Sequence, residues 1–152
     1  MTTIQDIADK LGISKSTVSK ALNNAPDISK SLQKQILETA VELGYTKLRR
    51  YKNPVKKLCV IIQRDNIEYE EPHHFAYDIV MGFRQIAEPA GYEVAVVPVD
   101  VNLQREISFD VFMLQHDFSG AFLLGFSLGE PWMKDLQTSR TPAALYDNHI
   151  VG

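Results

Sequence analysis

The 152-residue sequence predicts two parts: an all-α, three-helix headpiece with a helix-turn-helix, followed by an α/β part built on a parallel sheet. Apolar residues recur at helical spacing over residues 1–45, and strand-like apolar runs then alternate with helical segments. The charge also changes sign, since residues 1–58 hold 11 Lys and Arg against 5 Asp and Glu, and residues 59–152 hold 5 against 14. A basic first part and an acidic second part indicate a nucleic-acid-binding head on a body with another role.

The first two predicted helices lie within residues 3–23 and are joined by a tight turn. Thr3 is a good N-cap for the first helix, with Asp6 placed to complete a capping box. Gly12 permits a left-handed turn, and Ser14 caps the second helix. The outward side chains of the second helix are polar or basic: Lys15, Ser16, Ser19, Lys20 and Asn23. Such a face can read bases in the major groove, whereas the simpler alternative is an ordinary solvated surface.

A third helix is predicted between Ser29, a natural N-cap, and Gly44, which suits a C-terminal stop. Its apolar residues repeat at helical spacing: Ile36, Leu37, Ala40 and Leu43. The third helix can therefore close a core over the first two. A bundle of ~45 residues lies near the lower limit for independent stability, so we expect the headpiece to be marginally stable alone.

Strands and helices alternate through the rest of the chain. Strands are predicted at 57–62, 93–99, 119–125 and 142–147, with helices at 75–90, 103–115 and 131–139. The first of these helices is expected to turn Ile79, Phe83, Ile86 and Ala87 inward. This alternation predicts a parallel sheet covered on both faces, with a ligand beyond the C-terminal ends of the strands.

Several function classes find no support in the sequence. Cys59 is the lone cysteine, so no disulfide is expected, and neither a signal peptide nor a long apolar run occurs. With no phosphate loop and no nucleophile elbow, we predict no catalytic residues and no cofactor. His73 and His74 are adjacent but lack a third ligand at a suitable spacing, so no metal site is predicted. Trp132 is assigned to helix packing or to the surface.

Four ordered motifs identify a family resemblance. They are Thr3-Ile4-Gln5-Asp6-Ile7-Ala8, Gly12-Ile13-Ser14, Thr17-Val18-Ser19-Lys20-Ala21-Leu22-Asn23 and Leu43-Gly44-Tyr45. Together they resemble the headpiece of the LacI/GalR family of bacterial repressors. The resemblance implies that Lys15, Ser16 and Lys20 read the operator, and that phosphate contacts or helix bracing come from Thr3, Ser14, Thr17, Asn23, Ser29 and Tyr45. Most relatives have Arg where Lys20 stands, and Lys lacks the rigid bidentate fork of that residue.

The resemblance also suggests how the chain is divided. Residues 1–46 would be the DNA-binding headpiece, 47–57 a basic hinge or linker, and 58–152 the first part of an effector-binding and dimerisation domain. The hinge departs from the family pattern, because the usual Pro-Asn start is missing and Pro54 disfavours a helix. The sequence leaves open whether the hinge enters the minor groove. Since the family's effector domain is longer, the chain is expected to be a fragment of a longer protein.

The α/β part is similar to the first half of the family's sugar-binding-protein-like effector domain. By that resemblance, Phe75, His74 and Asp147 are expected to contact the effector, with Asp147 accepting hydrogen bonds from ligand hydroxyls. On the residues alone, Phe75 could equally be a core residue, and Asp147 could cap the segment that follows it.

The function implied by the resemblance is a cytoplasmic, nucleoid-associated transcriptional regulator, a repressor rather than an enzyme. It would bind double-stranded operator DNA as a homodimer or a higher oligomer, with no membrane partner. A small-molecule effector, a sugar, would control its operator affinity. Two other hypotheses stay open: a regulator whose α/β part only dimerises or senses a protein, and a small α/β enzyme with a basic helical extension. The operator, the effector's identity and the direction of regulation are not encoded in any motif.

Overall fold

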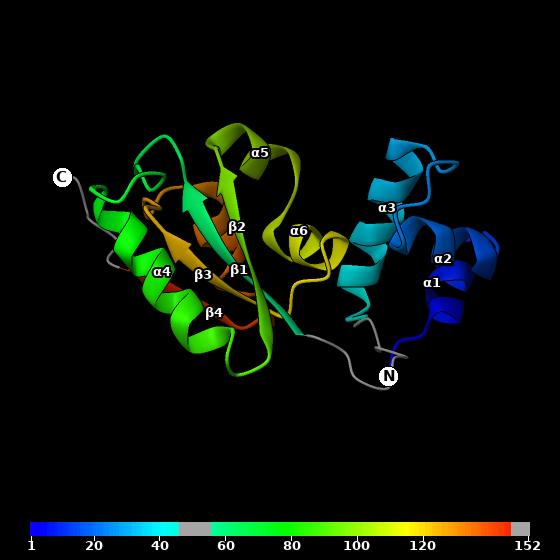
Figure 1. The fold of residues 1–152 in the computed structure, drawn as a ribbon. Coiled ribbons are helices and arrows are strands. Elements are labelled where there is room, and N and C mark those ends of the chain that lie inside the picture. Colours follow the sequence, from blue (N-terminus) through cyan, green and yellow to red (C-terminus); the bar gives the residue numbers. More distant parts are fainter. Residues whose placement is uncertain (46–55, 147–152) are drawn as a thin grey trace. The chain divides into compact units, whose positions relative to one another are not determined.

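The structure, a computed structural model, describes residues 1–45 and 56–146. These residues fall into two compact units: residues 1–45 with 114–117, and residues 56–113 with 118–146. The first contains the three N-terminal helices, and the second contains a parallel sheet with helices on both faces (Figure 1). The predicted fold class is confirmed.

Short-range hydrogen bonds define the helices of the headpiece: α1 (Ile4–Leu11), α2 (Lys15–Leu22) and α3 (Lys30–Glu42). Thr3 and Asp6 form the predicted capping box on α1. Ser14 and Ser29 each accept a hydrogen bond from the backbone amide three residues further on, which caps α2 and α3. Gly12 has a left-handed backbone (φ 66°) at the end of α1, so the chain can turn at once into α2.

The core of the headpiece is aliphatic. Its buried side chains are Ile7, Ala8, Val18, Ala21, Leu22, Ile36, Leu37 and Ala40. Each of the three helices contributes one apolar face, as the spacing predicted. The caps on the three helices add to this core by fixing the helix ends.

The second unit is built on four parallel strands: β1 (Lys56–Gln63), β2 (Tyr92–Val99), β3 (Gly120–Leu124) and β4 (Ala143–Tyr146). Their order across the sheet is β2-β1-β3-β4. Val60 on β1 is in register with Val96 on β2 and with Phe122 on β3. The connections run outward from β1 to β2 and then back past β1 to β3. The C-terminal ends of β1 and β3 therefore flank the topological switch point, where open α/β sheets bind ligands.

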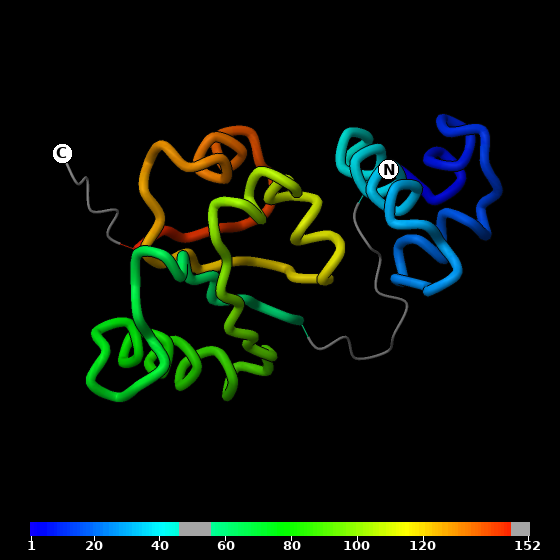
Figure 2. Tube along the Cα trace, turned by 90° about the horizontal axis from the view of Figure 1, so that it is seen from above, coloured from blue at the N-terminus to red at the C-terminus, as the bar shows by residue number. Residues whose placement is uncertain are grey.

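Helices cover both faces of this sheet. The helix α4 (Phe75–Ala87) lies on one face, and α5 (Val101–Glu106), α6 (Phe109–Gln115) and α7 (Pro131–Asp135) lie on the other (Figures 1 and 2). Alternation along β1 sends Val60 and Ile62 into the cluster beneath α4, whereas Cys59 and Ile61 join the opposite cluster. The near-continuous apolar run of β1 follows from this burial on two sides.

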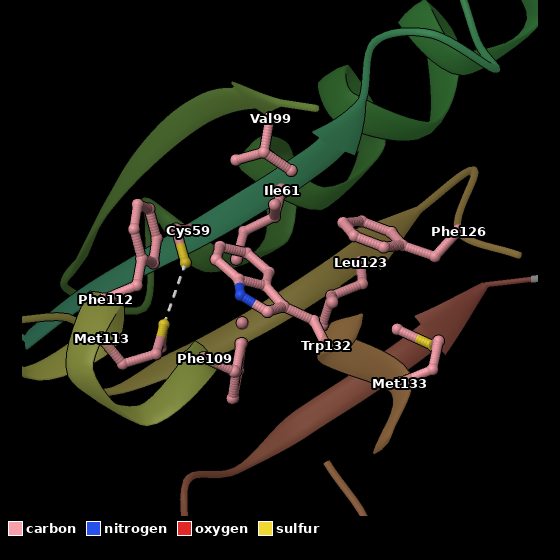
Figure 3. Packing of buried hydrophobic residues seen from close by; sticks show 11 residues of the cluster. Cys59, Ile61, Val99, Phe109, Phe112, Met113, Leu123, Phe126, Trp132 and Met133 are labelled. Carbon is pink, nitrogen blue, oxygen red and sulfur yellow. Dashed lines mark hydrogen bonds between the residues drawn. The ribbon is translucent and has the colours of Figure 1, made fainter. Parts of the chain in front are cut away.

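Trp132 lies at the centre of the larger core cluster (Figure 3). The side chain is fully buried, and its ring lies 5.6, 5.0 and 6.3 Å from the rings of Phe109, Phe112 and Phe126. The indole N–H donates to the carbonyl of Ile107 at 2.8 Å, so the one polar atom of the side chain is satisfied. Of the two assignments made from the sequence, packing is correct.

The predicted helix at 103–115 is wrong in one respect, because two helices occupy it. Ile107 has an extended backbone (φ −136°, ψ 133°) between α5 and α6. The amide of Phe109 then donates to the carboxylate of Asp135 at 3.0 Å. A side chain from α7 therefore accepts a hydrogen bond from the first amide of α6. Periodicity along the chain could not indicate this contact between two helices.

Two further helix predictions need correction. Ile86, expected to face inward on α4, is 79% exposed, while Ala76, Val80 and Ala87 are buried. Ile79, Phe83 and Ala87 pack against the core as predicted, so only Ile86 departs from the predicted stripe. The helix predicted at 131–139 ends at Asp135, after which the chain continues in turns.

Candidate nucleic-acid interface and effector site

The predicted reading face, formed by Lys15, Ser16 and Lys20, lies on the exposed side of α2. The opposite side of the helix is anchored by Val18 and two other buried residues. Lys15 and Ser16 are the first two helical residues, and no acidic residue occurs in the first turn of α2. Free amides and the helix dipole at this end attract phosphate. The geometry thus brings a positive helix end and three exposed polar side chains onto one helix.

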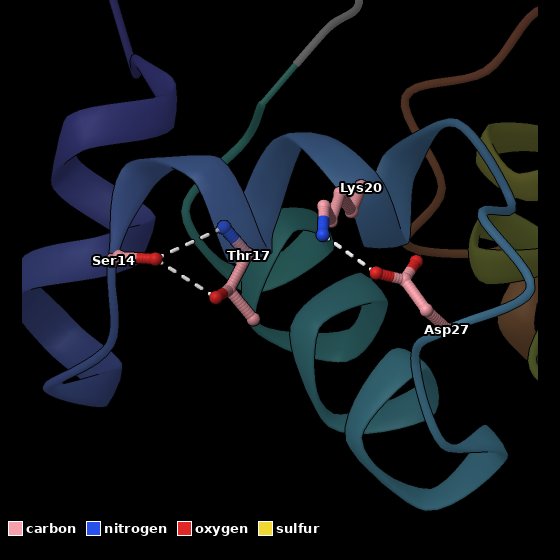
Figure 4. A network of polar contacts seen from close by, with 4 residues as sticks. All are labelled: Ser14, Thr17, Lys20 and Asp27. Carbon is pink, nitrogen blue, oxygen red and sulfur yellow. Dashed lines mark hydrogen bonds and ion pairs between the residues drawn. The ribbon is translucent and has the colours of Figure 1, made fainter.

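Lys20 has an acidic partner within the headpiece (Figure 4). Its Nζ lies 2.5 Å from Oδ2 of Asp27 in the loop between α2 and α3, and both side chains are about half exposed. The hydrogen bond from Lys20 is the main reason that the pKa of Asp27 lies below its ordinary value. Asp27 was not singled out from the sequence, because no local pattern links a loop carboxylate to a residue on the preceding helix.

The other predicted DNA contacts are engaged within the headpiece. Thr3, Ser14 and Ser29 act as helix caps, and the side-chain oxygens of Ser14 and Thr17 lie 2.8 Å apart. The side-chain amide of Asn23 donates to the Ser19 carbonyl. The backbone amide of Tyr45 donates to the Ala40 carbonyl. These contacts account for the bracing part of the prediction. Phosphate contact by the same residues remains a prediction.

Two exposed aromatic rings meet in the second unit. Phe75 begins α4 and is 67% exposed, which excludes the alternative that it is a core residue. Its ring lies 6.2 Å from the ring of Tyr146 at the end of β4, and that ring lies 6.3 Å from the ring of Phe122. Asp147 follows Tyr146 in the chain and lies outside the described residues, as do residues 47–55 of the predicted hinge. Residues 56 and 57 of that hinge begin β1 instead.

His74 immediately precedes α4, and both of its ring nitrogens have partners. Nδ1 accepts a hydrogen bond from the amide of Glu71 at 3.2 Å, and Nε2 lies 3.1 Å from a carboxylate oxygen of Glu68. The side chain is only 17% exposed. His74 therefore braces the loop that leads into Phe75, while its contact with an effector remains a prediction.

The same loop contains a group of atoms that could hold a metal ion. Glu71, His73 and His74 each offer one ligand atom, and these atoms all lie within 4.8 Å of one another. The fold thus supplies a third donor, Glu71, that the spacing of the sequence did not suggest. Each histidine ring already contacts a carboxylate here. Nδ1 of His73 lies 3.3 Å from a carboxylate oxygen of Glu71, and Nε2 of His74 contacts Glu68. Contacts between the two rings and these carboxylates are sufficient to explain this arrangement.

A buried carboxylate organises the switch point between β1 and β3. Glu130 accepts hydrogen bonds from the side-chain amides of Gln63, Asn66 and Gln104 at 3.2, 3.1 and 2.7 Å, and from the backbone amide of Ser127 at 3.2 Å. These donors come from the end of β1 and the turn after it, from α5 and from the loop after β3. One carboxylate therefore ties together the segments that surround the expected ligand edge. Sequence reasoning missed Gln104 and Glu130, because their burial depends on partners far away in the chain.

The headpiece matches a known family model. Residues 3–47 match the model described as "Bacterial regulatory proteins, lacI family". Residues 3–47 therefore form a lacI-family headpiece. The predicted resemblance is confirmed for these residues, which include α1, α2 and α3 with the whole reading face.

Curated relatives extend the similarity beyond the headpiece. Catabolite control protein A of Priestia megaterium is 26% identical over 148 residues, which cover 94% of this chain and 42% of that protein. The NTD biosynthesis operon regulator NtdR of Bacillus subtilis (strain 168) is 30% identical over 134 residues, which cover 87% of this chain and 39% of that protein. The chain thus spans about two-fifths of the length of these relatives. Both are regulatory proteins by name, which agrees with the prediction that the chain is not an enzyme.

One solved structure, that of the transcriptional regulator CelR–cellobiose complex, matches 95% of this chain and 42% of that chain, with 20% identity and a TM-score of 0.46. Among residues 1–45 and 56–146, none of the helices has the length and apolar character needed to span a bilayer.

Proposed function

We propose that this lacI-family chain forms the DNA-binding and first sensing part of a transcriptional repressor. The observation that carries the proposal is the exposed reading face of Lys15, Ser16 and Lys20 on a helix anchored to the core by its other side. A helix held in this way can enter the major groove, where Lys reads guanine edges and Ser reads several bases. The excess of Lys and Arg in residues 1–58 supports the same role.

Operator binding is proposed to use two copies of the chain. Two α2 helices would enter successive major grooves about 34 Å apart, on a near-palindromic site. Contacts with phosphate should dominate the affinity, so binding should weaken steeply as salt is raised. Such a regulator would act on the nucleoid in the cytoplasm.

The effector is proposed to be a sugar bound at the C-terminal edge of the sheet. The exposed rings of Phe75 and Tyr146 lie beside each other there and can pack on the apolar face of a sugar ring. Asp147 would accept hydrogen bonds from hydroxyl groups, and His74 would hold the loop before α4 in place. The sugar would change operator affinity only by binding two conformations of the regulator unequally.

Selection of bound sequences from random double-stranded DNA, with and without a panel of sugars, tests the whole proposal on the full-length protein. We expect one near-palindromic sequence to be enriched and one sugar to change its recovery. Failure to enrich any sequence at low salt would contradict the DNA-binding role. Enrichment that no sugar changes would instead favour an α/β part that dimerises or senses a protein.

Two variants separate the two sites. Lys20→Ala is expected to weaken binding to the selected operator by about 1–3 kcal/mol and to relax the preference at one base position. Equal losses on operator and random DNA would make Lys20 a phosphate contact only. Asp147→Ala is expected to abolish the sugar response and leave DNA affinity unchanged, and a normal response would remove Asp147 from the site.

A further inference from the structure

We infer that Asp27 acts as a specificity-determining residue by competing with DNA for the ammonium group of Lys20. The inference rests on the proposed DNA-binding role of α2. In the free headpiece Lys20 Nζ lies 2.5 Å from Asp27 Oδ2, so one of the three reading side chains is already bound to a carboxylate (Figure 4). To reach a base or a phosphate, Lys20 has to exchange that carboxylate for the nucleic acid.

The loop that carries Asp27 is fixed to both neighbouring helices. Asn24 adopts a left-handed backbone (φ 55°), which asparagine tolerates well, and its side-chain oxygen accepts a hydrogen bond from Gln33 on α3 at 2.7 Å. The amide of Ala25 donates to the carbonyl of Lys20 at 2.9 Å. Pro26 further restricts the backbone just before Asp27. The carboxylate is therefore held near the end of α2 rather than carried on a free loop.

Comparison with a second ion pair in the headpiece shows what is distinctive about the Lys20–Asp27 pair. Lys10 Nζ lies 2.8 Å from Glu42 Oε2, and that pair joins α1 to α3 away from the reading face. Exposed pairs of this kind contribute little to stability. The Lys20–Asp27 pair differs because one partner is a reading residue, so its main consequence concerns the DNA-bound state rather than the fold.

The competition favours a cognate site over random DNA. On the operator, a contact with a base replaces the contact that Lys20 loses when it separates from Asp27. On random DNA no such contact is offered, so Lys20 stays with Asp27, and the negative carboxylate opposes close approach of phosphate. Asp27 thus lowers non-specific affinity more than specific affinity, which raises the ratio of the two.

The test compares the wild-type protein, Asp27→Asn and the matched control Glu38→Gln on the selected operator and on random duplex over a series of salt concentrations. Glu38 is exposed on α3 and lies 3.9 Å from Lys34, so the control makes the same charge change away from the reading face. At low salt, Asp27→Asn should bind random DNA about two- to fivefold more tightly, the range for releasing one exposed ion pair. Its gain on the operator should be smaller, and the slope of log affinity against log salt on random DNA should steepen by up to about one unit.

The double variant Lys20→Ala/Asp27→Asn separates competition from simple charge. Without Lys20, Asp27→Asn should gain no more than the Glu38→Gln control gains. An undiminished gain would mean that Asp27 acts as a general negative charge, and the inference would be overturned. Unchanged DNA binding by Asp27→Asn would overturn the inference but leave the proposed function standing. Failure of the wild-type protein to bind any DNA at low salt would overturn both.

Discussion

The headpiece and the second unit, here called the sheet unit, are stabilised by contacts that span different distances along the chain. In the headpiece, aliphatic side chains fill the core, and caps such as Ser14 act on amides three residues away. In the sheet unit, Trp132 packs on rings that come from α6 and from the loop after β3, and Glu130 accepts hydrogen bonds from three other segments. The helix ends of the headpiece therefore depend on local contacts over a core shared by its three helices, whereas the sheet unit depends on a few central groups.

The largest expected effect follows from the central place of Trp132 in the sheet unit. Trp132→Ala removes a fully buried side chain with three aromatic neighbours, so it should lower the free energy of unfolding of this unit by about 3–5 kcal/mol. Chemical denaturation followed by circular dichroism measures the loss. Phe75→Ala, at a 67% exposed position, is the matched aromatic control and should change stability by less than about 0.5 kcal/mol.

The reactivity of Cys59 provides a second measurement of the effect of Trp132→Ala, because Cys59 and Trp132 belong to the same core cluster. Burial raises the pKa of the Cys59 thiol to about 12, so the folded protein should react slowly with thiol reagents at neutral pH. Trp132→Ala should speed the modification, and Phe75→Ala should not. Equal rates in the two variants would show that Trp132 does not hold this core together.

The next largest effect should come from the buried carboxylate. Glu130→Gln keeps the size of the side chain but replaces one acceptor oxygen with a donor that faces other amide donors. We expect a loss of about 1–3 kcal/mol, the cost of leaving a buried polar group unsatisfied. Urea denaturation measures it, with Glu93→Gln at an exposed position of β2 as the control. A loss no larger than that of the control would mean that water replaces the missing acceptor.

The contrast between the units also explains what the sequence could predict. The capping box of Thr3 and Asp6, the turn at Gly12 and the cap at Ser14 are all local, and the structure confirms each of them. The apolar face of α2 follows from periodicity, which leaves Lys15 on the outside. Most of the headpiece and its reading face could therefore be predicted from short stretches of sequence.

The features that escaped prediction depend on residues distant in the chain or on the next element. The break at Ile107 accompanies an amide bonded to Asp135, and Ile86 is exposed although the other predicted inward residues of α4 pack against the core. The acceptor role of Glu130 requires partners on three other segments. The pairing of Asp27 with Lys20 requires a specific loop path. The edge that would bind an effector was predictable from the strand pattern, but the residues that organise it were not.

In the headpiece, a single cap should have a smaller and more local effect. Ser14→Ala removes the oxygen that accepts from the Thr17 amide at 3.1 Å, so α2 should lose about 1 kcal/mol of local stability. Hydrogen exchange of the α2 amides measures this loss within the intact chain. Ser31→Ala, at an exposed helical position of α3, is the control, because Ser31 is not an N-cap. If protection in the sheet unit fell as much as in α2, the local character of headpiece stability would be disproved.

The smallest expected effect is the pH dependence of the α1 cap. The Thr3 amide donates to Asp6 Oδ2 at 2.7 Å, and this bond is the first cause that lowers the pKa of Asp6 below its ordinary value of 3.8. Because the folded-state pKa is depressed, the contribution of the cap is fully present above pH 3.8 and is lost as the pH falls through the lower folded value. The chemical shift of the Thr3 amide should therefore titrate with a midpoint below 3.8, and Asp6→Asn should abolish that titration. A midpoint at or above 3.8 would contradict the capping box, and loss of sheet-unit signals over the same pH range would show that the two units do not respond separately.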